Sequence, residues 1–208
     1  PSRGLGDVYK RQVAAPLNAL PGTIPGTIAD MSHSKQVNRT IDLSIHDVYE
    51  VVTSEAFLLT DEGMVEQTES QIIEAEREVL PDGRVWARVG VRASQKELED
   101  LSKDGEAPIA YQETYVSRPD ETGAFEVKAE MDLPLKMGTM DTHFVYAPIA
   151  GGSGEVAAEG AAETAVEAIL TADVSVPLIA GRLEKHLLKA ADKTVDNSLA
   201  RIKNLGSA

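Results

Sequence analysis

The chain has 208 residues, with 34 Asp and Glu against 20 Lys and Arg and a formal net charge of −14. This length suffices for one domain with a sizeable core, and the negative charge repels phosphate backbones, which excludes a general nucleic-acid binder. The chain has no cysteine, which excludes disulfides, thiolate catalysis and zinc–thiolate sites. No apolar run approaches the roughly 20 residues of a membrane span. We therefore expect no stable membrane insertion and a cytoplasmic location.

Residues 1–30 differ in composition from the rest of the chain. Residues 1–12 (PSRGLGDVYKRQ) resemble translated sequencing-adapter read-through, and residues 13–29 hold three prolines and no charge. A secretory signal peptide, the alternative, requires a continuous apolar core of about 7–15 residues, which Pro16 interrupts. We therefore expect residues 1–30 to be a non-native or disordered leader and residues 31–208 to form one domain.

The chain beyond the leader begins with a strand and two short helices. Alternating side chains over residues 36–43 predict a strand, and Ser44 followed by Asp47 resembles the capping box of a helix N-terminus. A second helix is expected to begin near Ser54 and to end at about residue 60.

A strand-rich region follows. Alternation of apolar and polar residues predicts six further strands, at residues 70–80, 84–93, 110–118, 125–133, 139–149 and 165–176. Pro81-Asp82-Gly83 is typical of a hairpin turn. Residues 150–164 (AGGSGEVAAEGAAET) are of low complexity and predict a mobile loop.

The last predicted element is a long helix. Pro177 ends the sheet, and an apolar stripe at helical spacing runs over residues 180–203. Short connections make the sheet antiparallel, and its apolar face must pack against this helix. The prediction is an α+β fold in which an antiparallel sheet of about six to seven strands wraps around a long C-terminal helix.

This order is that of the helix-grip fold, and residues 171–185 (TADVSVPLIAGRLEK) carry a more specific resemblance. The strand, the proline, two aliphatic residues, a glycine and the Glu-bearing helix start resemble an uncharacterised actinobacterial family of the START-like, polyketide-cyclase-like (SRPBCC) superfamily. The resemblance covers residues 37–202. It implies a curved sheet and a cavity between sheet and helix that holds apolar, lipid-like or polyketide-like small molecules. It supplies no established catalytic residues.

Inward-facing apolar residues are the candidate ligand contacts, and the alternative is that they form an ordinary core. The candidates are Val127, Met131, Met140, Phe144 and Leu170 from the strands and Leu183, Leu187 and Ala191 from the helix. Small residues opposite one another, such as Ala129 and Ala172, leave room that aromatic side chains would have filled. Because large voids are destabilising unless they are occupied, a ligand is physically sensible.

Polar residues near these stripes are candidates for contact with a ligand head group. Arg39 and Arg77 lie on the apolar sides of their strands, where they either reach solvent at the strand ends or anchor a ligand carboxylate or phosphate. We assign the head-group contact to Arg77, Tyr115 or His143. No two histidines have metal-ligand spacing, and we expect neither a metal nor a cofactor.

Three functions stay open at the level of sequence. The first is binding or transfer of a hydrophobic or amphipathic small molecule, without catalysis. The second is a cyclase- or dehydratase-like enzyme that uses the same cavity, with His143 as the most plausible acid or base. The third is a packed structural or interaction domain without a ligand.

Overall fold

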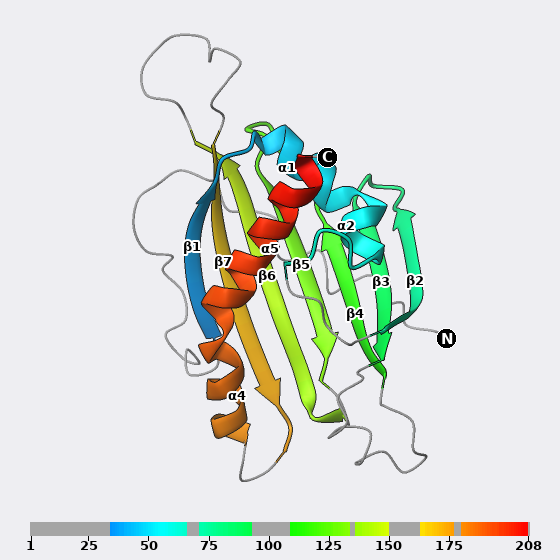
Figure 1. Cartoon of the computed structure of the whole chain (residues 1–208), viewed down its shortest axis with the longest axis vertical. Helices are drawn as coiled ribbons and strands as arrows, with labels where there is room; N and C mark the ends of the chain where they lie inside the picture. The colour runs from blue at the N-terminus through cyan, green and yellow to red at the C-terminus, as the bar shows by residue number, and fades with distance from the viewer. Residues whose placement is uncertain are drawn as a thin grey trace, which may run out of the picture. The chain divides into compact units, whose positions relative to one another are not determined.

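The computed structural model describes residues 34–65, 71–92, 109–133, 136–149, 163–176 and 180–207. The predicted leader and most of the 150–164 loop therefore lie outside the described residues. The described part contains one antiparallel seven-stranded sheet with the order β1-β7-β6-β5-β4-β3-β2 (Figure 1). Its strands are β1 Ser34–Ile41, β2 Gln71–Val79, β3 Val85–Arg92, β4 Ile109–Val116, β5 Phe125–Asp132, β6 Gly138–Pro148 and β7 Thr164–Val174. The predicted α+β, helix-grip fold class is confirmed.

Two short helices follow β1, and both begin at a serine, as expected. Helix α1 spans Ile45–Thr53, and the Ser44 side chain accepts a hydrogen bond from the Asp47 backbone N–H at 3.1 Å. Helix α2 spans Glu55–Leu59, and the Ser54 hydroxyl accepts from the Phe57 N–H at 3.2 Å. These contacts satisfy backbone donors that have no partner within the helix.

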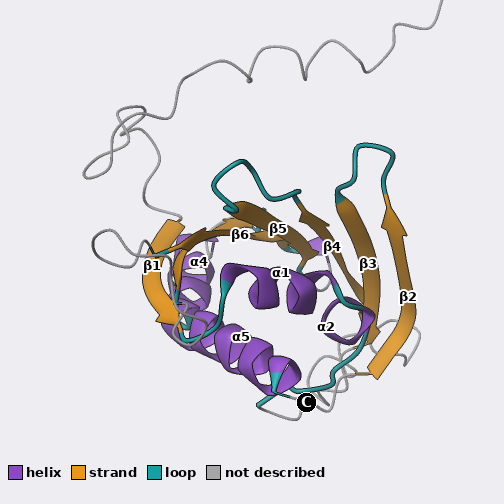
Figure 2. Cartoon of the chain, turned by 90° about the horizontal axis from the view of Figure 1, so that it is seen from above, coloured by secondary structure: helices purple, strands orange, loops and turns teal. Residues whose placement is uncertain are grey.

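The helices lie on the concave side of the curved sheet, here called the inner face (Figure 2). The domain core forms where α1, α2 and the C-terminal helix meet this face. Three aromatic rings mark its centre: Phe125 stacks on Tyr146 with 4.9 Å between centroids, and Tyr49 of α1 meets Phe125 edge-on at 5.0 Å. Aromatic pairs at such distances add to the stability gained by burial.

The C-terminal helix consists of two segments, which corrects the single helix expected over residues 180–203. Helix α4 spans Ala180–Lys189 and α5 spans Ala191–Gly206. At the junction the Ala190 N–H donates to Leu187 O over 3.1 Å, a tighter three-residue turn. The two segments also pack on different neighbours, α4 on β7 and α5 mainly on α1 and β1. The apolar stripe runs unbroken through the sequence of both segments, so it does not predict that α4 and α5 pack against different elements.

Two further expectations on the strands need correction. Thr164 is not in a loop: it begins β7, is fully buried, and donates its hydroxyl to Leu43 O at 2.8 Å. The alternation in β2 predicts burial of every second residue, but Ala75 is exposed and Val79 is 58% exposed. The register of β2 shifts between Ile72 and Glu74, and β2 forms an edge of the sheet.

Candidate functional site

The inner face divides into a closed part and a half-covered part, because residues paired across neighbouring strands share one face. One row is closed from β1 to β3. Its six residues on these strands are each at most 8% exposed, namely Val37, Ala168, Phe144, Val127, Val116 and Val85. Only its last member, Val79 on edge strand β2, is exposed. Helices α1 and α5 cover the core at this part of the sheet.

The next two rows toward the α4 end carry smaller or more flexible side chains. The first row contains Ala87, Thr114, Ala129, Thr142 and Leu170, and the second contains Val89, Gln112, Met131, Met140 and Ala172. The members of both rows on β5 and β6 are only half-buried. None of the described helices is drawn in front of this end of β4, β5 and β6 (Figure 1). The half-buried members, here called the inner-face patch, are Val89, Gln112, Ala129, Met131, Met140 and Thr142.

Neutral polar groups lie within these rows, and they are not among the residues predicted from the sequence. The Gln112 side-chain amide donates to the Thr114 hydroxyl over 3.2 Å, and Thr114 is only 6% exposed. Thr142 lies two strands away in the same row as Thr114. The signal that would have found them is parity: counting back in twos from the buried Val116 gives Thr114 and then Gln112.

The eight apolar residues predicted to contact a ligand separate into two groups. Four of them, Val127, Phe144, Leu170 and Ala191, belong to the closed core. The other four, Met131, Met140, Leu183 and Leu187, are half-buried. The structure thus distinguishes residues that pack the core from residues that present an accessible apolar surface.

Helix α4 borders the patch along β7. Its Glu184 is 4% exposed, and a carboxylate oxygen accepts a hydrogen bond from the Val174 backbone N–H over 3.1 Å. The described part of β1 begins opposite Thr171, so Val174 lies beyond that pairing and the carboxylate acts as a strand partner would. The Glu in the resemblance motif therefore fixes α4 to the sheet.

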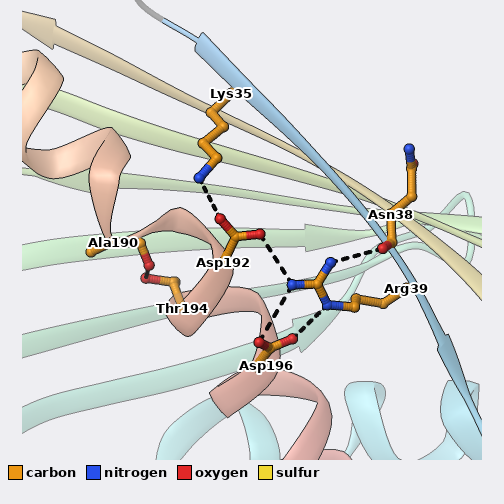
Figure 3. A network of polar contacts seen from close by, with 7 residues as sticks. All are labelled: Lys35, Asn38, Arg39, Ala190, Asp192, Thr194 and Asp196. Carbon is orange, nitrogen blue, oxygen red and sulfur yellow. Dashed lines mark hydrogen bonds and ion pairs between the residues drawn. The ribbon is translucent and has the colours of Figure 1, made fainter.

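Charged residues at the β1 end are held by α5 (Figure 3). Arg39 donates through Nε to Asp196 over 2.7 Å and through an Nη atom to Asp192 over 3.1 Å, and Lys35 donates to Asp192. The hydrogen bond with Lys35, followed by that with Arg39, lowers the pKa of Asp192, although desolvation opposes it. Arg39 and Lys35 thus connect the sheet to α5.

Arg77 occupies the opposite end of the Thr114 row, since it pairs with Ala87. It is half-buried, and its Nε donates to Thr53 O over 2.9 Å, at the carboxyl end of α1. Three strand spacings of about 4.8 Å separate it from Ala129, a distance of roughly 14 Å. Arg77 can meet a molecule on the patch only if that molecule extends this far.

Tyr115 and His143 lie on the outer face, which corrects their assignment to the head-group contact. Their neighbours Thr114 and Phe144 point inward, so the alternation of a strand turns both away from the helices. His143 Nε2 is 3.1 Å from a Glu126 carboxylate oxygen that also contacts Lys128 Nζ at 2.9 Å. Desolvation opposes ionisation of Glu126, but Lys128 and then His143 outweigh it, and its pKa is lowered.

Other features of the described residues lie away from the patch. An open depression of about 310 Å³ is lined by Glu74, Ala75, Glu76 and Arg88 at the β2–β3 end of the sheet. Within the described ranges, no cluster of three or more His, Asp and Glu residues could hold a metal ion. No helix in the described part is both long and apolar enough to cross a membrane.

Comparison with solved structures shows a START-like fold. A START superfamily protein from Mycobacterium smegmatis superposes with a TM-score of 0.51 at 15% identity, over 83% of this chain and 99% of that one. A conserved protein from Geobacillus kaustophilus gives 0.51 at 8% identity, over 84% and 95% of the two chains. Human STARD10 gives 0.51 at 10% identity, over 84% and 66%.

These identities establish the fold alone, so what is confirmed of the resemblance is its START-like fold. A comparison with curated proteins finds no matching sequence. The family model described as "Protein of unknown function (DUF2505)" matches residues 36–204. Because this match runs from β1 through most of α5, the chain belongs to the DUF2505 family.

Proposed function

We propose that this protein binds a hydrophobic or amphipathic small molecule, lipid-like or polyketide-like, on the inner-face patch beside α4. The observation that carries the proposal is the division of one sheet face into a closed row and two half-covered rows. A purely structural domain gains stability by covering its central strands completely. Here Ala129, Met131 and Met140 lie on central strands and stay half-buried.

The side chains of the patch suit an adaptable apolar ligand. Methionine is flexible and polarisable, which lets Met131 and Met140 adjust to different shapes. Ala129 between Thr114 and Thr142 provides space, and Leu183 and Leu187 of α4 add half-buried apolar surface. The START-like fold supports the proposal by analogy only.

The geometry gives an enzymatic function less support. His143 was the most plausible acid or base, and it lies on the outer face, where it pairs with Glu126. The binding function is therefore supported by neighbouring residues of the inner-face patch. The catalytic alternative has no such support, because His143 does not face the patch.

Native mass spectrometry of the full chain, with solvent extraction of any co-purifying molecule, tests the proposal. We expect a bound apolar molecule at close to one per chain, and at least tenfold weaker rebinding in Ala129→Phe, which fills the patch. Lys128→Phe is the matched control, because it adds the same ring one residue away on the outer face. A clean apo mass together with no binding from a panel of lipids and polyketides would exclude the proposed function.

A further inference from the structure

The half-covered rows carry no charged residue between β3 and β7. From Ala87 to Leu170 and from Val89 to Ala172, every paired residue is apolar or carries a hydroxyl or amide. Charged residues of the first row occur only at its ends: Arg77 donates to Thr53 O, and Lys35 donates to Asp192. A molecule on the centre of the patch therefore meets no charged side chain from these two rows.

This arrangement selects against charged ligands. Burying a carboxylate, sulfonate or ammonium group without a partner carries a large desolvation penalty. The nearest acidic residues of β5 and β6, namely Glu130, Asp132 and Asp141, have outward parity. They cannot balance a ligand cation on the inner face.

The polar side chains of the patch can form hydrogen bonds with an uncharged polar group of a ligand. The Thr114 hydroxyl accepts from the Gln112 amide, so its own proton points elsewhere as a donor, and the Gln112 carbonyl stays an acceptor. Thr142 adds a second hydroxyl to the same row. A ligand hydroxyl both donates and accepts, and it can complete this set of hydrogen bonds.

We propose that the ligand is electrically neutral, with an apolar body and a hydroxyl or carbonyl group that hydrogen-bonds to Gln112, Thr114 or Thr142. This inference rests on the proposed function, and it narrows the amphipathic class to molecules without a charged group on the patch. It also assigns the specificity to polar groups inside the sheet face rather than to a basic residue at its rim.

Two fluorescent probes with the same skeleton test whether the patch prefers a neutral ligand over a charged one. N-Phenyl-1-naphthylamine is neutral, and 8-anilino-1-naphthalenesulfonate differs from it by one sulfonate. Titrations of the full chain at 0.5 M NaCl reduce the general repulsion by a chain of net charge −14, because the screening length falls to about 4 Å. We expect the neutral probe to bind at least tenfold more tightly, and Ala129→Phe to abolish its signal.

The possible outcomes distinguish the inference from the function on which it rests. Affinities within threefold of each other, both lost in Ala129→Phe, would overturn the neutral class and leave the proposed function standing. Failure of both probes to bind would overturn both.

Displacement of the neutral probe by 1-decanol tests the hydrogen-bonding group itself. Gln112→Met keeps the length of the side chain and should weaken decanol binding about fivefold, the effect of one neutral hydrogen bond. Tyr115→Phe removes a polar group from the outer face of the same strand and should leave decanol binding unchanged. Equal decanol affinity in Gln112→Met and wild type would overturn the contact assigned to Gln112. If Gln112 had only a structural role, its replacement would not weaken the binding of decanol.

Discussion

Gly138 at the start of β6 is the position where a single added methyl group should disturb the wall of the patch most directly. Its φ is +135°, and a Cβ atom there would lie 1.9 Å from the Asp173 carbonyl oxygen of β7. A Cβ atom essentially never lies closer than 3.0 Å to such a neighbouring atom, so Gly138→Ala forces β6 and β7 apart by about 1 Å. The backbone strain is on the order of 1–3 kcal/mol.

The displacement also weakens backbone hydrogen bonds around the β5–β6 turn. Gly138 O accepts from the Leu133 N–H at 2.8 Å, and Met137 O accepts from the Ser175 N–H at 2.8 Å. Loss of one such bond adds about 1 kcal/mol, so we expect Gly138→Ala to reduce the free energy of unfolding by about 3 kcal/mol. Urea titration followed by the fluorescence of Trp86, the single tryptophan, measures this, and amide exchange at Leu133 should accelerate.

The matched control is Gly181→Ala in α4. A Cβ atom added at Gly181 would meet no heavy atom within 4 Å, and alanine favours a helix over glycine by up to about 1 kcal/mol. We expect this variant to be unchanged or slightly more stable. A loss below 1 kcal/mol in Gly138→Ala, or an equal loss in both variants, would refute the steric reasoning.

Three further predictions concern the core, the outer face and α2. Phe125→Ala should lower the free energy of unfolding by about 4 kcal/mol in urea titrations, because a buried aromatic residue is lost from the ring cluster; a loss below 2 kcal/mol would contradict this packing. Lys128→Met should raise the pKa of Glu126 in a carboxyl ¹³C NMR titration, since Lys128 lowers it more than His143 does. Because the pKa of Glu126 is lowered in the folded protein, ionised Glu126 stabilises the fold at pH values above 4.5, the ordinary pKa of this carboxyl group. This stabilisation is lost as the pH falls through the folded pKa. An unchanged pKa of Glu126 in Lys128→Met would contradict the pairing of Lys128 with Glu126. Arg201→Met should destabilise by about 2 kcal/mol, measured by urea titration, because the guanidinium donates to three carbonyl oxygens near the end of α2, and a neutral effect would show that solvent replaces those bonds.

Strand periodicity predicted the sheet well where both neighbours of a strand are present. The inward assignments of Val127, Phe144 and Leu170 hold because a central strand is fixed on both sides and its parity cannot slip. Edge strand β2 has only one neighbour, and its register shift between Ile72 and Glu74 follows no pattern in the apolar residues. Its exposure was therefore not predictable from periodicity.

The candidate site was predicted only in part, for two physical reasons. The apolar lining follows from alternation, but the distinction between Phe144 in the core and Met140 on the patch depends on which helix lies above each row. Such long-range packing leaves no local sequence pattern. Tyr115 and His143 were chosen for their chemical groups, whereas their outward direction follows from the parity of Thr114 and Phe144.

The attachment of β1 has a consequence for the order in which the protein folds. Its strand partner is β7, with Ser34 opposite Thr171, and Lys35 and its partner Asp192 are 157 residues apart. At about 5–20 residues per second of synthesis, β7 follows β1 by several seconds or more. The hairpins from β2 to β6 join strands that are adjacent along the chain and can form in that interval. The domain is therefore completed by a late step, in which an early segment of the nascent chain waits to be joined by a much later one.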